Sequence, residues 1–180
     1  MPDLAHINTH FGTPCLKLDG TVVRGVLRPA QDVRATFHEL LFPRSMFVVA
    51  PDQPVEAGDA IIDPQGDTYL CGQWSDSRMG KRLVARQFVL FFAPYMAQWQ
   101  RDILSTEPIS GLSVSSGLRS MGVFPALKEP EKRAQDQERV MIDLTRILMG
   151  VPLQIGDYVD GARIQRVENM LGMTYAEAYT

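Results

Sequence analysis

A short pattern occurs twice in this 180-residue chain: a Gly-Asp turn, a brief apolar strand, a tighter turn and a second strand. The first copy spans residues 58–74 and the second spans residues 156–168. Asp160-Gly161 in the second copy is the preferred dipeptide for a two-residue hairpin turn that needs positive φ. Pro64-Gln65-Gly66 supplies a longer equivalent in the first copy. Both copies therefore predict tight β-hairpins.

An apolar segment precedes each hairpin, residues 46–50 before the first copy and residues 145–149 before the second. A 45% hydrophobic composition is enough to build the core of one ordinary domain or two compact ones. We therefore predict a mainly β fold of two small antiparallel barrels or sandwiches in tandem, residues 1–96 and 97–180. Pro94 marks the expected boundary between them.

Strands are expected where β-branched and aromatic residues gather. Residues 83–92 also fit a helix, but their valines and phenylalanines favour a strand. Residues 97–103 alternate as the opening strand of the second unit. One short amphipathic helix is expected over residues 29–41, where Val33, Phe37, Leu40 and Leu41 fall at helical spacing. The other expected strands are residues 15–18, 21–28, 45–50, 60–62 and 68–74.

Two segments of the second half do not read as strands. The Ser/Gly-rich residues 107–122 predict an extended loop within residues 105–125. The mixed-charge run 129–139 predicts either a solvated helix turn or a linker.

A sequence-independent nucleic-acid binder usually carries an excess of basic side chains that contact phosphates. This chain has a net charge of −3 and a pI of about 5.6 instead. Only weak or transient contact with DNA is expected. No apolar run approaches the roughly 20 residues of a membrane helix. Residues 1–6 lack the features of a signal peptide, so we expect the chain to stay in the cytoplasm after synthesis. Cys15 and Cys71 are expected to be buried free thiols.

Residues that could form a catalytic or metal site do not form a convincing one. His6 and His10 fit a polar tail, and His38 fits a half-exposed position on the expected helix. Asp59, Asp63 and Asp67 recur at a spacing of four, but Pro64 and the lack of a terminal glutamate break an EF-hand arrangement, which favours turn chemistry. Residues 113–117 lack the flanking glycines of a nucleophile elbow. We expect no catalytic residue, metal or cofactor.

Basic and aromatic side chains give two weaker signals. Arg78, Lys81, Arg82 and Arg86 bracket a turn, which favours a solvated hairpin end over a contact with phosphate or with an acidic partner. Trp74 and Trp99 lie at strand ends, where either a core or an interface role is expected.

The order of elements in the first half resembles the head-tail joining family of tailed bacteriophages, which comprises head-closure or stopper proteins. The stretches that carry the resemblance are residues 21–29, 45–49, 55–62 and 67–74. It implies a structural virion protein of the neck, with no enzymatic activity. Copies would form a ring of six or twelve beneath the portal, extending or closing the DNA channel. The second half departs from a one-barrel joining protein by adding a related barrel.

The resemblance also implies partners: a portal or adaptor protein, tail proteins, other copies of the chain and, transiently, genomic DNA. The long insertions at residues 28–44 and 107–122 are expected to make inter-ring or channel contacts, because long loops in compact barrels are often functional. The residues expected at these contacts, together with the basic hairpin end, are Arg28, Arg34, Phe37, Arg44, Arg78, Lys81, Arg82, Leu112 and Arg119.

Three alternatives stay open. One is another connector ring component, an adaptor or a tail terminator. A second is a small-barrel nucleic-acid-binding module, because residues 156–161 with Arg163 and Arg166 also resemble SH3-like RNA-binding domains, although the net charge argues against it. The third is an enzyme whose site is assembled from distant residues.

Overall fold

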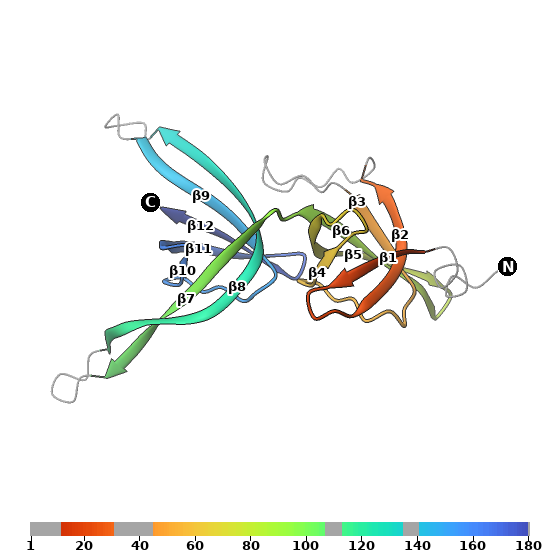
Figure 1. The fold of residues 1–180 in the computed structure, drawn as a ribbon, viewed down its shortest axis with the longest axis horizontal. Helices are drawn as coiled ribbons and strands as arrows, with labels where there is room; N and C mark the ends of the chain where they lie inside the picture. The colour runs from red at the N-terminus through yellow and green to blue at the C-terminus, as the bar shows by residue number, and fades with distance from the viewer. Residues whose placement is uncertain (1–11, 31–44, 107–112, 135–140, 180) are drawn as a thin grey trace.

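The computed structural model describes residues 12–30, 45–106, 113–134 and 141–179, and these form strands and turns without a helix. No helix capable of crossing a membrane occurs in this part of the chain. The strands gather in two groups along the long axis of the molecule (Figure 1). They are β1 Thr13–Lys17, β2 Val22–Pro29, β3 Ser45–Val49, β4 Ala60–Ile62, β5 Thr68–Met79, β6 Arg82–Phe92, β7 Tyr95–Thr106, β8 Ser113–Ala134, β9 Met141–Met149, β10 Tyr158–Val159, β11 Ala162–Met170 and β12 Met173–Tyr179.

Each group of six strands closes into an antiparallel barrel. The first barrel has the order β1-β2-β3-β6-β5-β4, and the second, read from its first strand, has the order β7-β8-β9-β12-β11-β10. Adding six to each strand number converts one order into the other, so the two barrels share one connectivity. The predicted tandem of small β-barrels is confirmed, and β4–β5 and β10–β11 are its two equivalent hairpins.

The turns of these two hairpins follow from their sequences. Val159 pairs with Ala162, which leaves Asp160 and Gly161 as a two-residue turn with φ values of 49° and 84°. Both values are positive, as this turn type requires. In the first barrel the Asp63 carboxylate accepts hydrogen bonds from the backbone N–H groups of Gln65 and Asp67, both at 2.9 Å. Asp63 therefore serves the turn, as predicted.

A buried apolar core fills each barrel. In the first, Phe47 and Ile61 are fully buried beside the free cysteines Cys15 and Cys71. Burial of a side chain of this size stabilises the folded state by about 1.5–3 kcal/mol relative to leaving it exposed. Burial, with a smaller contribution from Asp63, raises the pKa of the Cys15 thiol to about 11. Both cysteines are buried free thiols, as predicted.

The structure decides the ambiguous segment 83–92 in favour of a strand. β6 pairs with β3 along Ser45–Val49 and with β5 along most of its length. A helix here would leave both neighbouring strands without a partner and the barrel open. The expected helix over residues 29–41 lies outside the described residues, apart from Pro29 at the end of β2 and Ala30.

The loop predicted for residues 105–125 is wrong wherever the chain is described. Residues 113–125 belong to β8, which pairs with β7 out to Thr106 and Ser113. Gly117 and Gly122, with φ values of 141° and 130°, adjoin register shifts in the β7–β8 pairing. The glycines thus accommodate bulges within a hairpin, whereas their density with serine suggested a loop.

The mixed-charge run was also misread. Residues 129–134 continue β8 and pair with β9, and Glu129 lies opposite Arg146. The charged residues of this segment therefore lie in a strand, where Glu129 and Lys132 face residues of opposite charge on β9, and not in a helix turn or a linker. Residues 135–139 of the run lie outside the described residues.

Candidate functional site

The predicted contact residues lie on separate hairpins. Arg78, Lys81 and Arg82 surround Gly80 at the turn of the β5–β6 hairpin, where all three are exposed. Arg28 is exposed near the end of β2, opposite Met46. Arg119 lies in β8 of the second barrel. The structure therefore brings together the basic hairpin end alone, while Arg34, Phe37, Arg44 and Leu112 lie outside the described residues.

Two long hairpins extend from the second barrel in opposite directions (Figure 1). Toward its outer end, the β7–β8 hairpin carries the exposed apolar side chains Ile103, Leu104 and Leu118. It carries charges of both signs, since Arg101 and Arg119 lie opposite each other and Asp102 follows Arg101 on β7. Sequence analysis ended the expected strand at Ile103 and placed Leu118 in a contact loop over residues 107–122, so it did not predict an apolar surface on a hairpin.

The two Gly-Asp turns, Gly58-Asp59 and Gly156-Asp157, share one hydrogen-bond pattern. The N–H of Gly58 donates to Cys71 and that of Gly156 to Ile164, at 2.8 and 2.9 Å. Each aspartate also accepts, at 2.8 Å, a hydrogen bond from the backbone N–H three residues before it. The repeat therefore begins earlier than the sequence analysis placed it, as Pro-Val-Glu-Ala-Gly-Asp at residues 54–59 and Pro-Leu-Gln-Ile-Gly-Asp at residues 152–157.

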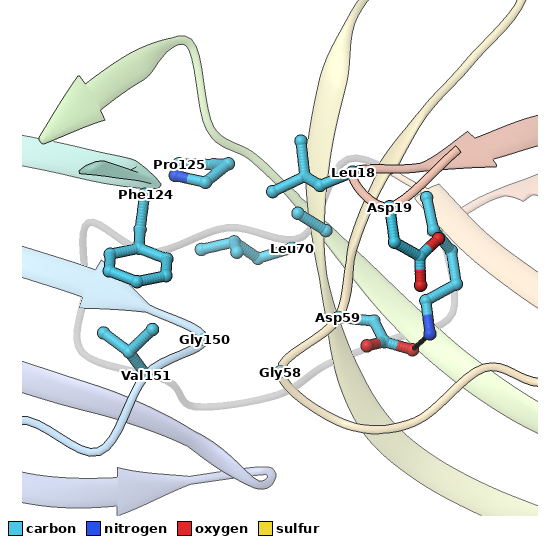
Figure 2. Close-up of a pocket in the computed structure, with 11 residues that line it drawn as sticks. Leu18, Asp19, Gly58, Asp59, Leu70, Phe124, Pro125, Gly150 and Val151 are labelled. Carbon is cyan, nitrogen blue, oxygen red and sulfur yellow. Dashed lines mark ion pairs between the residues drawn. The ribbon is translucent and has the colours of Figure 1, made fainter. Parts of the chain in front are cut away.

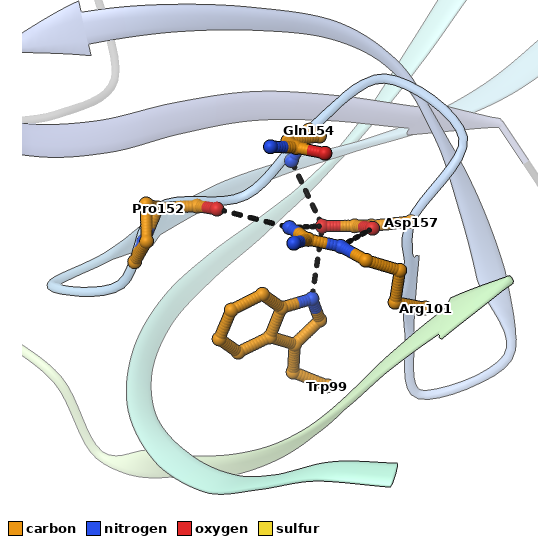
Figure 3. Close-up of polar contacts among 5 residues, drawn as sticks. All are labelled: Trp99, Arg101, Pro152, Gln154 and Asp157. Carbon is orange, nitrogen blue, oxygen red and sulfur yellow. Dashed lines mark hydrogen bonds and ion pairs between the residues drawn. The ribbon is translucent and has the colours of Figure 1, made fainter. Parts of the chain in front are cut away.

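Asp157 is the centre of a buried polar cluster in the second barrel (Figure 3). The Arg101 guanidinium donates to both carboxylate oxygens, at 2.8 and 2.9 Å, and the Trp99 indole N–H donates at 2.9 Å. Asp157 is only 2% exposed. Burial alone would raise the pKa of this carboxyl, but hydrogen bonds from Arg101, Gln154 and Trp99 outweigh it and hold the pKa below its ordinary value. All these contacts are internal to the barrel, so the cluster is structural.

Asp59 occupies the equivalent place in the first barrel with a different partner. The Lys17 ammonium lies 2.9 Å from its carboxylate, and both side chains are partly exposed. The hydrogen bond to Asp59 raises the pKa of Lys17. One backbone frame thus holds an aspartate in both barrels, but only the second barrel buries it.

A row of alternating charges crosses the second barrel. Glu129, Arg146, Glu177 and Arg166 lie opposite one another on β8, β9, β12 and β11 in that order. Arg146 and Glu177 are buried, and Arg166 also pairs with Glu168. Arg166, one of the two arginines behind the nucleic-acid alternative, is therefore engaged within the barrel.

The barrels meet along a close contact that we call the seam. The second barrel contributes Gly150 and the β11–β12 turn, Leu171-Gly172, and the first barrel contributes Ala57, Gly58 and Gly72. The N–H of Gln73 donates to the carbonyl of Leu171 at 2.9 Å. A Cβ added at Gly150 would lie 1.8 Å from the Gly58 oxygen, and one at Gly172 would lie 2.4 Å from Ala57 Cβ. Only glycine allows these backbones to approach so closely.

An apolar cluster drawn from both barrels surrounds the seam. Leu70, Val89 and Phe91 of the first barrel pack with Leu148, Met173 and Tyr175 of the second. All six side chains are buried. Continuous packing of this kind opposes motion of one barrel relative to the other.

A half-open cavity of about 260 Å³ lies beside the seam. Leu18 and Leu70 of the first barrel face Phe124, Pro125 and Val151 of the second across it (Figure 2). Its charged wall comprises the Lys17–Asp59 ion pair and Asp19, whose carboxylate accepts a hydrogen bond from the Thr21 N–H at 2.8 Å. The cavity is thus a mainly apolar hollow with one wall of charged side chains.

Metal-ligating side chains do not cluster in the described part of the chain, where no group of three or more His, Cys, Asp or Glu residues could hold an ion. Trp99 is a core residue, whereas Trp74 is exposed. The chain matches no family model, no curated protein and no solved structure.

Proposed function

We propose that this protein is a structural ring component of the neck of a tailed bacteriophage, joining the portal of the DNA-filled head to the tail and extending or closing the DNA channel. The observation that carries the proposal is a tandem of two closed barrels that share an apolar cluster and from which long hairpins project. The strands β2, β3, β4 and β5 fall on the stretches that resemble the head-tail joining family. The partners proposed are a portal or adaptor protein on one side and tail proteins on the other.

The rigidity of the tandem supports a mechanical role. A neck component holds two large assemblies in line, so its own domains must not swing relative to each other. The glycine contacts of the seam and the shared apolar cluster oppose such a motion. The projecting β7–β8 hairpin, with Ile103, Leu104 and Leu118 exposed, offers an adhesive surface to a neighbouring protein.

The charge distribution supports passage of DNA without tight binding. The net charge is −3, and the basic side chains are spread over hairpins of both barrels. A channel that lets DNA slide must not hold many phosphates at once, because each strong contact adds to affinity. The same reasoning ranks the neck role above a nucleic-acid-binding module.

Disruption of the gene in the phage genome that encodes this chain tests the proposal. We expect packaged heads and free tails that fail to join, and joining restored by the protein supplied in trans. A matched variant with Ile103, Leu104 and Leu118 replaced by serine should fold, as judged by circular dichroism, yet restore joining poorly. Normal joined particles in the absence of the gene would rule the neck role out.

A further inference from the structure

The half-open cavity beside the seam has a size that suits a single large side chain. Its volume is about 260 Å³, whereas pockets that enclose a whole small molecule usually hold about 300–1,000 Å³. Gly58 and Gly150 form part of its lining and have no side chains to fill it. Because residues of both barrels line the cavity, a group that enters it contacts the two barrels at once (Figure 2).

The charged wall of the cavity carries one more negative charge than positive charge. The Lys17 ammonium pairs with Asp59 and also donates to the Pro54 carbonyl at 3.2 Å. No described cation lies within ion-pair distance of Asp19, whose carboxylate accepts a hydrogen bond from the Thr21 N–H. That hydrogen bond lowers the pKa of Asp19, so the carboxylate is ionised at neutral pH. The wall therefore attracts a further cation.

The rest of the cavity is apolar and includes an aromatic ring. Leu18 and Leu70 lie on one side of it, and Phe124, Pro125 and Val151 lie on the other. An arginine side chain suits both surfaces, because its methylene stem packs on apolar atoms while its planar guanidinium stacks on a ring and forks onto a carboxylate. A lysine ammonium is more strongly hydrated and suits an apolar cavity less well.

Exposed apolar side chains continue outward from the cavity on both barrels. Leu16 and Val22 lie opposite each other on β1 and β2, next to the turn that lines the cavity. Met96 lies opposite Pro125, and Val123 lies two residues before Pro125 on the same face of β8. Leu16, Val22, Met96 and Val123 are all exposed. A small molecule in the cavity would leave these side chains uncovered, whereas a polypeptide that crosses it would cover them.

We propose that this cavity is a docking site for a partner protein that inserts an arginine side chain flanked by apolar residues. The arginine stem packs against Leu18 and Phe124, its guanidinium binds Asp19, and the flanking residues cover Leu16 and Met96. Arginine is one of the residue types that most often dominate the energy of a protein interface. The site goes beyond the proposed function, since it fits any such partner, the portal, adaptor or tail proteins among them.

Binding of short peptides to the full-length chain tests the proposal. The probes are acetyl-Leu-Arg-Leu-amide and the same peptide with citrulline, the uncharged analogue of arginine. We expect millimolar binding of the arginine peptide, about tenfold tighter than that of the citrulline peptide, because hydrogen bonds to charged groups are the stronger ones. Amide NMR shifts measure both affinities, and the largest shifts should occur at Leu18, Asp19 and Val151.

Two variants separate the charged wall from the apolar surfaces. Asp19→Asn keeps an oxygen that accepts the Thr21 N–H but removes the charge, so the arginine peptide should bind about tenfold more weakly and the citrulline peptide as before. Leu18→Ser should weaken both peptides alike, because both pack on the apolar surface. The matched control, Asp102→Asn, changes a carboxylate further out on the β7–β8 hairpin and should alter neither affinity.

Equal affinities of the unaltered protein for the two peptides, or shifts confined to residues outside the cavity, would overturn the proposal. So would binding of acetyl-arginine-amide as tightly as the arginine peptide, because the site would then take a small cation instead of a polypeptide. These results do not depend on the folding of any variant. No phage component is needed, so the docking site can fail while the neck role stands, and gene disruption can refute the neck role while the docking site stands.

Discussion

The two barrels share their strand connectivity and their Gly-Asp frame, yet they differ in what surrounds that frame. Asp157 in the second barrel is buried under Trp99 and Arg101, whereas Asp59 in the first is partly exposed and paired with Lys17. The hairpins differ as well, since the described strands β7, β8 and β9 are longer than their counterparts β1, β2 and β3 in the first barrel. The backbone hydrogen bonds that close a barrel tolerate little change, while paired side chains and hairpin lengths are free to diverge.

The largest difference should appear when each aspartate is removed. Asp157→Ala takes away a buried carboxylate and leaves Arg101 and Trp99 without their acceptor, so we expect a loss of about 4 kcal/mol of unfolding free energy. Asp59→Ala removes a partly exposed ion pair and one turn hydrogen bond, at a cost of about 1 kcal/mol. Urea denaturation measures both, and equal losses would contradict the contrast drawn between the barrels.

The seam should respond to a single methyl group. Gly150→Ala would place a Cβ 1.8 Å from the Gly58 oxygen, and we expect a loss of about 3 kcal/mol because the backbones must separate. Gly66→Ala is the matched control: its Cβ meets open space, and only its φ of 92° costs about 1 kcal/mol. If the two variants lose the same stability, the seam is looser than described.

Asp157 and Lys17 should set opposite limits on the pH range in which the fold is stable. The folded pKa of Asp157 lies below its unfolded value, so its contribution is present above about pH 4 and is lost as pH falls through the folded pKa. Lys17 has a raised pKa, so its contribution is present below about pH 10 and is lost as pH rises through the folded pKa.

Melting temperatures measured from pH 2 to pH 11 check this prediction. Asp157→Asn should flatten the acid side of the profile, and Lys17→Met should flatten the alkaline side. The effect of Lys17→Met should be the smaller, because its ion pair is partly exposed. An unchanged acid side in Asp157→Asn would show that other carboxylates govern acid unfolding.

The smallest effect is expected from removing one donor. Trp99→Phe keeps the ring in the core but deletes the indole N–H that donates to Asp157, which should cost about 1 kcal/mol. Trp74→Phe, on the exposed part of β5, should cost less than half of that. A larger loss in Trp74→Phe would mean that Trp74 has a structural role that its exposure does not indicate.

The sequence predicted the parts of this fold that depend on neighbouring residues. Asp160-Gly161 correctly predicted the hairpin turn, and the valines and phenylalanines of residues 83–92 correctly predicted β6. β8 was missed because its serines and glycines have low strand propensity, and pairing with β7 and β9 stabilises it instead. Local composition could not reveal a strand whose partners lie elsewhere in the chain.

The polar cluster and the seam were missed for a related reason. Trp99 and Asp157 meet only after β7 pairs with β10 and closes the barrel, and nothing in either local sequence marks the other. The repeated Pro-Φ-(Glu/Gln)-x-Gly-Asp pattern at a constant offset was a usable signal, because it identifies the two loops that are equivalent in the barrels. The predicted contact residues Arg78, Lys81 and Arg82 do share one hairpin end, but their role in contacts stays a prediction.

The proposed neck role is tested most directly by electron cryomicroscopy of the particles into which this chain assembles. The account predicts a ring of copies between portal and tail. In every copy the two barrels should be arranged as they are in this structure, and the projecting hairpins should contact neighbouring proteins. Density for the chain elsewhere in the particle, or particles that lack it altogether, would contradict the account.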